Sequence, residues 1–411
     1  MRVPKRLTIA VALSLACGLT ASAHADDDAR QPSAKHVLLV SVDGLHQADL
    51  DWFVNANPNS TLALLVRHGV AYTNAQTPFP SDSFPGMVGQ VTGGNPKTTG
   101  IYYDDAYSRS LLPKGTTAAN CHSTKPGAEV FYAEVIAKDL NRLDSGQNIP
   151  GLYADFSRIS QLTGHPQDLI DPAFLPVSPV TCQPVYPHQY LKVNTIFEVA
   201  KKHGLHTAWS DKHVAYEILN GPSGQSIDDL FAPEINSSVT DPSLPAGPGD
   251  DWTKDNTNTQ RYDSFKVKAV LNWIKGLDHA GNGMGSDATG TAVTKAFSQA
   301  GARKIYAGEE AADLFGVGSN DDRVPDLVGI AQQGTVYAGG KLSKIAEHGG
   351  GAKQDRHVPI VVWGAGIGQN IVDDPVQTNQ IAPTILALLG LKPHELQAVQ
   401  AEHTKVLPHL R

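Results

Sequence analysis

The run of residues from Val37 to Asp43 has the clearest strand pattern in the chain, and it ends on a carboxylate that is followed at once by Gly44. Its largely apolar character predicts a fully buried strand that carries Asp43 at its carboxyl end. In open parallel sheets this edge is where ligands bind. These residues alone leave a second interpretation open, in which Asp43 and Gly44 only turn the chain into the next helix.

Helical and extended patterns alternate along the rest of the chain. The predicted elements are a helix after Ser60, a strand over Val70–Thr73, a helix after Asn194, a strand over Leu205–Ser210, a strand over Val358–Trp363 and a helix over Thr378–Leu389. This order predicts an α/β fold with a mostly parallel central sheet and helices on both of its faces.

Residues 1–25 have the composition of a secretory signal peptide. Basic residues near the start precede an apolar stretch over Leu7–Leu19, and small residues follow it. We therefore expect a secreted or periplasmic protein whose signal peptide is cleaved near Ala23 or Ala25. No later apolar run approaches the ~20 residues that a membrane span requires.

Two loop-rich stretches, near residues 111–181 and 221–259, interrupt the alternation. Both are rich in residues such as Pro, Gly, Ser and Asn. Because such sequence cannot form a core by itself, we interpret both as insertions in one domain that spans residues 26–411.

The charge balance of the mature chain is acidic. Removal of residues 1–25 takes away three of the 33 basic residues and none of the 41 acidic ones, which leaves a net charge of −11. This balance argues against a nucleic-acid partner held by a basic surface.

Two cysteines remain after cleavage, Cys121 and Cys182, and both lie in loop sequence. In an oxidising compartment a single structural disulfide is favoured over a reactive thiol or a metal site. We therefore expect these two residues to be bonded to each other.

A short helix pattern begins at Ser83 and ends at Gly93. The pattern places a hydroxyl at the positive end of a helix dipole. That position suits a nucleophile that attacks an anionic phosphorus centre, since free backbone N–H groups can receive the phosphate oxygens. The alternative is that Ser83 is an ordinary helix cap.

Several short motifs follow one another in a specific order. They are Val42-Asp43-Gly44, Ser83-Phe84-Pro85-Gly86, Val91-Thr92-Gly93, Thr99-Gly100-Ile101, Ala346-Glu347-His348-Gly349-Gly350 and the helix pattern around Ile381-Ala382-Pro383-Thr384. This series resembles the type I phosphodiesterase/nucleotide pyrophosphatase family of the alkaline phosphatase superfamily. It does not resemble the sulfatases, because Met87 stands where their motif has arginine.

The resemblance implies an alkaline-phosphatase-like fold and a hydrolase that cleaves phosphodiester or nucleotide pyrophosphate bonds in a small phosphorylated substrate. In such enzymes two Zn²⁺ ions flank an alkoxide nucleophile. Matched residue by residue, the resemblance implies that Asp43 is a metal ligand, Ser83 the metal-bound nucleophile and His348 a late histidine ligand.

The central metal ligands of the family have no clear counterpart in this sequence. Asp278 and His279 form the nearest adjacent pair, but they follow a helix pattern and not a buried strand. Asp211 and His213 do follow a strand pattern, but they lie earlier in the chain than expected. Asp104 stands about where the pyrophosphatases have a phosphate-contacting asparagine, and its charge would repel the substrate unless a cation neutralised it.

Two functional hypotheses of different classes follow. The first is an exported, metal-dependent hydrolase that uses Ser83 and two zinc ions. The second is a catalytically silent relative with an incomplete two-metal site, one zinc ion or none, and a binding or structural role.

Overall fold

The computed structural model describes residues 34–132, 135–240, 252–253, 256–283, 290–295, 301–332 and 348–410. The predicted signal peptide, residues 1–25, lies outside this described part. None of the described helices is long and apolar enough to cross a membrane.

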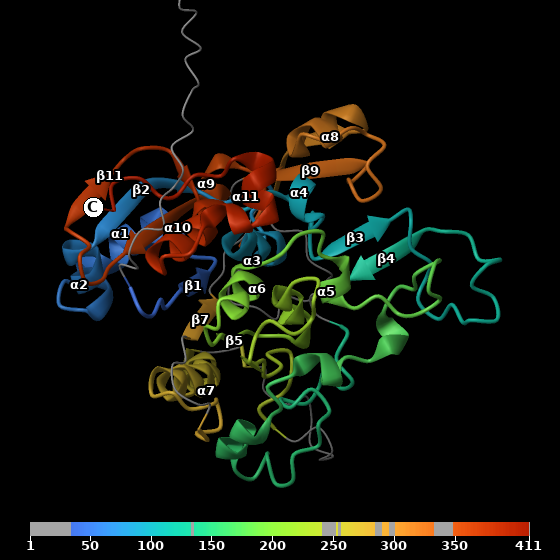
Figure 1. The fold of residues 1–411 in the computed structure, drawn as a ribbon, viewed down its shortest axis with the longest axis horizontal. Helices are drawn as coiled ribbons and strands as arrows, with labels where there is room; N and C mark the ends of the chain where they lie inside the picture. Colours follow the sequence, from blue (N-terminus) through green and yellow to red (C-terminus); the bar gives the residue numbers. More distant parts are fainter. Residues whose placement is uncertain are drawn as a thin grey trace, which may run out of the picture.

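Four parallel strands form the first sheet, in the order β1-β7-β5-β6. Figure 1 shows the neighbouring strands β1, β7 and β5 of this sheet. Their bounds are β1 (Val40–Asp43), β5 (Ala208–Ser210), β6 (Asp229–Phe231) and β7 (Gly290–Lys295). Their carboxyl ends lie at one edge, because parallel strands all run in the same direction. The sequence analysis missed β6, which lies in the stretch that was interpreted as a loop insertion.

Strand β1 ends at Asp43 as predicted, but it is less buried than predicted. Val40 is 56% exposed and Val42 is 40% exposed. Among the described strands β1 stands at the end of its sheet and pairs with β7 alone. The prediction of a fully buried strand is therefore wrong, because an apolar run does not indicate how many neighbours a strand has.

A second sheet is built on β2, with β10 antiparallel to it and β11 and β12 parallel to it. The bounds are β2 (Val70–Gln76), β10 (His357–Val362), β11 (Asn370–Val372) and β12 (Val376–Gln377). The prediction that the strand near Val358 lies in one parallel sheet with β1 is wrong. Side chains such as Tyr72 and Ile360 pack in a separate apolar cluster, which favours the pairing of β2 with β10.

Two antiparallel hairpins lie outside these sheets (Figure 1). They consist of β3 (Asp105–Ser108) with β4 (Ala128–Phe131) and of β8 (Gly301–Ala307) with β9 (Leu327–Gln332). The first hairpin opens the segment that the sequence analysis interpreted as an insertion.

The predicted helices form, and their ends follow local capping signals. Ser60 caps α2 by accepting a hydrogen bond from the Ala63 N–H. Thr195, one residue after the predicted Asn194, caps α6 together with Glu198. The described helices are α1 (Gln47–Ala56), α2 (Thr61–His68), α3 (Ser83–Thr92), α4 (Pro96–Thr99), α5 (Pro187–Tyr190), α6 (Ile196–Lys202), α7 (Asn256–Ile274), α8 (Glu309–Phe315), α9 (Lys353–Arg356), α10 (Ile381–Leu388) and α11 (Gln397–Glu402).

One large apolar core holds α3 in place. Val88 and Val91 of α3 pack in the same cluster as Leu386 of α10 and Trp209 of β5. The segment 111–181 adds buried residues to this cluster, for example Leu162. Isolated aliphatic residues among prolines and glycines are thus sufficient to anchor this segment in the main core.

Cys121 and Cys182 form a disulfide, which confirms the predicted pairing. Their Cα atoms are 5.8 Å apart, within the range that bridging requires. The bond closes a loop with a sequence separation of 61 residues. It thus constrains most of the segment 111–181.

We expect that replacing both Cys121 and Cys182 by serine lowers the free energy of unfolding by about 4 kcal/mol, because the open loop gains entropy in the unfolded chain. Urea unfolding followed by tryptophan fluorescence measures the change. His122→Ala, next to the disulfide, is the control and should leave the midpoint nearly unchanged. A double variant as stable as the wild type would contradict the expected role of the disulfide.

Candidate active site

Three side chains singled out from the sequence converge at the carboxyl edge of the first sheet. The Ser83 hydroxyl donates to Asp43, with Oγ at 2.8 Å from Oδ2 and at 3.1 Å from Oδ1. Nε2 of His348 lies 3.2 Å from Oδ1 of the same carboxylate. Residues from three distant parts of the chain thus meet around Asp43, while their catalytic and metal-binding roles stay predictions.

Ser83 is the first residue of α3, and Asp82 is the cap of this helix. The Asp82 carboxylate accepts a hydrogen bond of 3.1 Å from the Phe84 N–H. The interpretation of Ser83 as the helix cap is therefore wrong by one residue. Because Asp82 supplies the cap, the Ser83 hydroxyl is directed to Asp43 at the positive end of the helix.

Lys212 completes the cluster. Its ammonium group donates to Asp43 Oδ2 at 2.8 Å and to Ser83 Oγ at 3.2 Å. The Lys212 side chain is 9% exposed and the Asp43 side chain 13% exposed. Since little water screens this pair, its electrostatic attraction is stronger than that of a surface ion pair.

A short loop holds His348 beside the start of α3. The backbone groups of Ser81 and Gly350 exchange two hydrogen bonds of 2.8 Å each. Gly349 has a φ of 99°, and a Cβ there would lie 2.7 Å from the Ser81 carbonyl oxygen. Only glycine fits this close approach, so the His-Gly-Gly sequence is a geometric requirement of the site.

Two carboxylates that the sequence analysis considered make local hydrogen bonds. Asp211 accepts from the Trp209 indole N–H and from the Lys212 N–H, both at 2.8 Å. Burial raises the pKa of Asp211, although the hydrogen bond from Trp209 and the charge of Lys212 oppose the shift. Asp104 accepts a hydrogen bond from the N–H of Asp105.

The candidate central ligands bind partners away from Asp43. Nδ1 of His213 lies 2.7 Å from Glu234, and Nδ1 of His279 lies 2.7 Å from Asp229. Asp278 accepts hydrogen bonds from the backbone and side chain of Asn282. The structure thus gives none of these residues a contact with the Asp43 cluster.

The described residues do not fit a two-zinc centre. Asp43, Ser83 and His348 offer three ligands, whereas two zinc ions with four ligands each need more. The Lys212 ammonium, which cannot ligate a metal while protonated, lies against two of the three.

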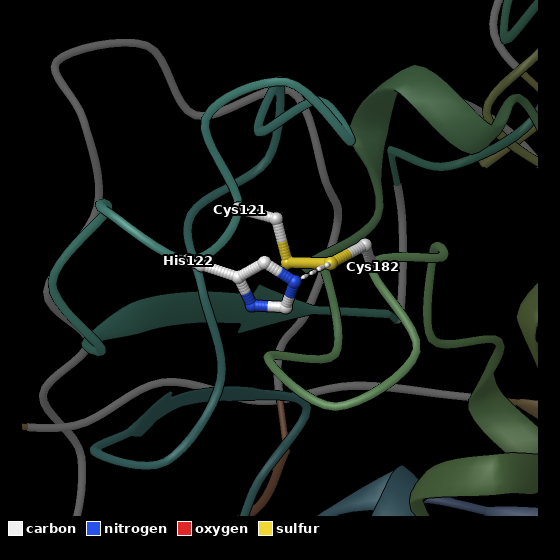
Figure 2. A group of neighbouring side chains, drawn as sticks. All are labelled: Cys121, His122 and Cys182. Carbon is white, nitrogen blue, oxygen red and sulfur yellow. Dashed lines mark hydrogen bonds between the residues drawn. A yellow bond between two sulfur atoms is a disulfide. The ribbon is translucent and has the colours of Figure 1, made fainter.

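The described part of the chain contains one group of three close metal-binding residue types, namely Cys121, His122 and Cys182. Figure 2 shows that the sulfur atoms of the two cysteines are bonded to each other, with His122 beside them. Disulfide sulfur is not the thiolate that binds metals. This group is therefore a structural disulfide and not a metal site.

A separate cavity of about 410 Å³ lies near α7. Its walls include Phe156, Arg261, Phe265 and His279. Neither Ser83 nor Asp43 lines it. This cavity is therefore distinct from the candidate active site.

Sequence reasoning did not recognise the importance of Lys212, although it considered both neighbours of this residue. One signal was available, because Lys212 comes two residues after a predicted strand that ends at Ser210. Strand β5 is parallel to β7, which is in turn parallel to β1. A residue just beyond β5 is thus expected at the same sheet edge as Asp43.

Comparison with known proteins supports both the fold and the family. Residues 37–297 of the 411 match the sequence profile described as type I phosphodiesterase / nucleotide pyrophosphatase. This range contains Asp43, Ser83 and Lys212, and it ends before His348. No curated protein matches the sequence.

Solved structures show an alkaline-phosphatase-like fold. Wild-type alkaline phosphatase PafA has a TM-score of 0.52 and 13% identity, covering 93% of this chain and 99% of that chain. A PafA mutant has a TM-score of 0.52 and 12% identity, covering 88% and 96%. Murine ectonucleotide pyrophosphatase/phosphodiesterase 5 has a TM-score of 0.44 and 11% identity, covering 87% and 96%. At these identities the PafA structures establish the fold alone.

We expect Gly349→Ala to lower the free energy of unfolding by about 1 to 3 kcal/mol, since the new Cβ must displace the Ser81 carbonyl from an already unusual backbone conformation. Urea unfolding measures the change. Gly366→Ala is the matched control, because Gly366 also has a positive φ but open space around its Cβ position. Equal losses for the two variants would show that the contact with Ser81 contributes nothing.

The ion pair of His279 with Asp229 should make stability depend on pH. Burial lowers the pKa of His279, but the hydrogen bond and charge of Asp229 outweigh burial and raise it overall. A raised pKa in the folded state gives stability that is complete below about pH 6.5 and is lost as the pH rises through the folded value. The free energy of unfolding should therefore fall as the pH rises above about 6.5.

The contribution of His279 to this fall can be isolated with two variants. In His279→Gln the fall should be smaller, as measured by urea unfolding across this pH range. His409→Gln removes an exposed histidine that is also paired with an aspartate, and should leave the slope unchanged. A slope that is the same in all three proteins would contradict the assignment.

Proposed function

The chain belongs to the type I phosphodiesterase/nucleotide pyrophosphatase family, and from this premise we propose that it hydrolyses phosphoester or nucleotide pyrophosphate bonds with Ser83 as its nucleophile. One observation carries the proposal. The Ser83 hydroxyl donates to a carboxylate at 2.8 Å, and its oxygen accepts from an ammonium group at 3.2 Å. A base and a cation thus contact the same hydroxyl, which is the arrangement that activates a serine nucleophile.

The reaction proceeds in two steps. In the first, the Ser83 oxygen bonds to phosphorus and its hydroxyl proton passes to Asp43, while the bond from phosphorus to the leaving oxygen breaks on the opposite side and that oxygen takes a proton from water. In the second, water bonds to phosphorus on that opposite side and releases a proton to the solvent, the bond from phosphorus to the Ser83 oxygen breaks, and the Ser83 oxygen takes its proton back from Asp43.

The proposed substrates are small phosphodiesters and nucleotides with a pyrophosphate bond, as the family implies. Members of this family are typically metal-dependent, and zinc is the expected ion. The described residues that would contribute ligands are Asp43, Ser83 and His348, which are enough for one ion and not for two. The predicted signal peptide and the disulfide between Cys121 and Cys182 support an exported, periplasmic or secreted enzyme.

A second candidate function is a catalytically silent relative that binds a ligand without turnover. One observation favours it. Both ring nitrogens of His279 make hydrogen bonds, Nδ1 with Asp229 and Nε2 with the Leu162 carbonyl, so this residue is not available as one of the missing metal ligands. The hydrolase is preferred because the contacts of Ser83 with Asp43 and Lys212 have a direct use in phosphoryl transfer.

Ser83→Ala tests the proposal. We expect the hydrolysis of bis-(p-nitrophenyl) phosphate to fall at least ~100-fold, since the nucleophile is lost. Acid quenching of the wild type during turnover of this substrate should trap a peptide in which Ser83 carries a p-nitrophenylphosphoryl group, detectable by mass spectrometry.

Ser123→Ala is the control for this experiment, because Ser123 is an exposed serine that donates to a backbone carbonyl far from Asp43. Its turnover should equal that of the wild type. Turnover that survives Ser83→Ala would refute the nucleophile assignment. The silent relative would instead show no turnover in any of the three proteins.

A further inference from the structure

We infer that Lys212 is a catalytic residue whose ammonium group takes the place and the charge of a metal ion beside Ser83. The inference rests on the proposed function and deepens it. It predicts that hydrolysis by this chain requires no two-metal centre.

The contacts of the Lys212 ammonium are those that a bridging cation would make. It binds Asp43 Oδ2 at 2.8 Å and the Ser83 oxygen at 3.2 Å, and that same carboxylate oxygen accepts the hydrogen bond of Ser83 at 2.8 Å. The three groups form a closed triangle. A zinc ion that took Asp43 Oδ2 and the Ser83 oxygen as ligands would need the space that the ammonium occupies, so the two cations exclude each other from this position.

The position of Lys212 is fixed by its backbone as well as by its side chain. Its N–H donates to Asp211 at 2.8 Å, and its carbonyl accepts from the N–H of Ile235 at 3.1 Å. Asp211 is held in turn by the indole of Trp209, whose side chain is fully buried. The lysine is thus anchored in the core on both sides of its Cα, unlike a flexible surface lysine.

The surroundings of the ammonium are apolar on one side. Lys212 Nζ lies 5.9 Å from the centre of the Tyr216 ring, and Phe84 packs edge-on against that ring. A positive charge that lies beside an aromatic ring and is shielded from solvent stabilises a developing alkoxide strongly. In the first chemical step Lys212 therefore stabilises the Ser83 oxygen while the hydroxyl proton passes to Asp43.

Metal removal tests the inference on the mature protein. After dialysis against EDTA, the wild type should contain less than one equivalent of zinc by mass spectrometry and should keep at least half of its Ser83-dependent turnover. Titration of wild type with zinc alone should show no two-ion site. Lys212→Asp, which exchanges the cation for a ligand, should bind at least one zinc ion more than the wild type.

Substitution of the lysine tests the charge itself. Lys212→Met should lower kcat at least ~100-fold with an unchanged circular dichroism spectrum. Lys212→Cys treated with 2-bromoethylamine regains an ammonium of similar length, and should recover at least a tenth of the wild-type rate. Cys121 and Cys182 are protected from the reagent by their disulfide. Lys114→Met, at an exposed ion pair, is the control and should retain full activity.

The outcomes separate the two proposals. Ser83-dependent turnover that needs two zinc equivalents and survives Lys212→Met would overturn the role of Lys212 and leave the proposed function intact. Failure of aminoethylation to restore any rate to a folded Lys212→Cys protein would overturn the role of the charge. A wild type without Ser83-dependent turnover, with or without zinc, would overturn both proposals.

Discussion

The site depends on one carboxylate, Asp43, which a strand delivers to the edge of a parallel sheet. Its two oxygens contact a hydroxyl, an ammonium group and an imidazole within 3.2 Å. A partly buried carboxylate needs such partners, because the loss of hydration would otherwise favour its neutral form. Three segments therefore converge on this residue, namely the helix start at Ser83, the segment after β5 and the loop at His348.

Local patterns predicted much of this arrangement. The strand that ends at Asp43, the helix that starts at Ser83 and the His-Gly-Gly turn could each be read from a few adjacent residues. The pairing between strands could not be predicted in this way, since the apolar runs of β1 and β10 look alike although the two strands lie in different sheets. Exposure of β1 was missed for the same reason, because burial depends on neighbours that the run itself does not encode.

The motifs also did not predict that a lysine compensates the charge of Asp43. The family resemblance directed attention to histidines and carboxylates, and so to Asp211 and His213 on either side of Lys212. In the structure Asp211 binds Trp209 and His213 binds Glu234. Lys212 is the residue that contacts Ser83. A motif specifies residue types at given spacings. Whether a position beside Asp43 holds a positive or a negative side chain depends on all the charges around it, and a motif does not include these.

The bridge between Ser81 and Gly350 determines when the site can form during synthesis of the chain. Ser81 is largely buried, and its backbone N–H and C=O are both satisfied by a residue near the other end of the chain. During synthesis the amino-terminal part emerges first, so the segment before the nucleophile has no such partner until the segment around Gly350 has been made. A nascent or truncated chain that lacks this segment therefore contains Ser83 and Asp43 without the bridge that fixes the start of α3, and the site forms only after Gly350 and His348 have been added.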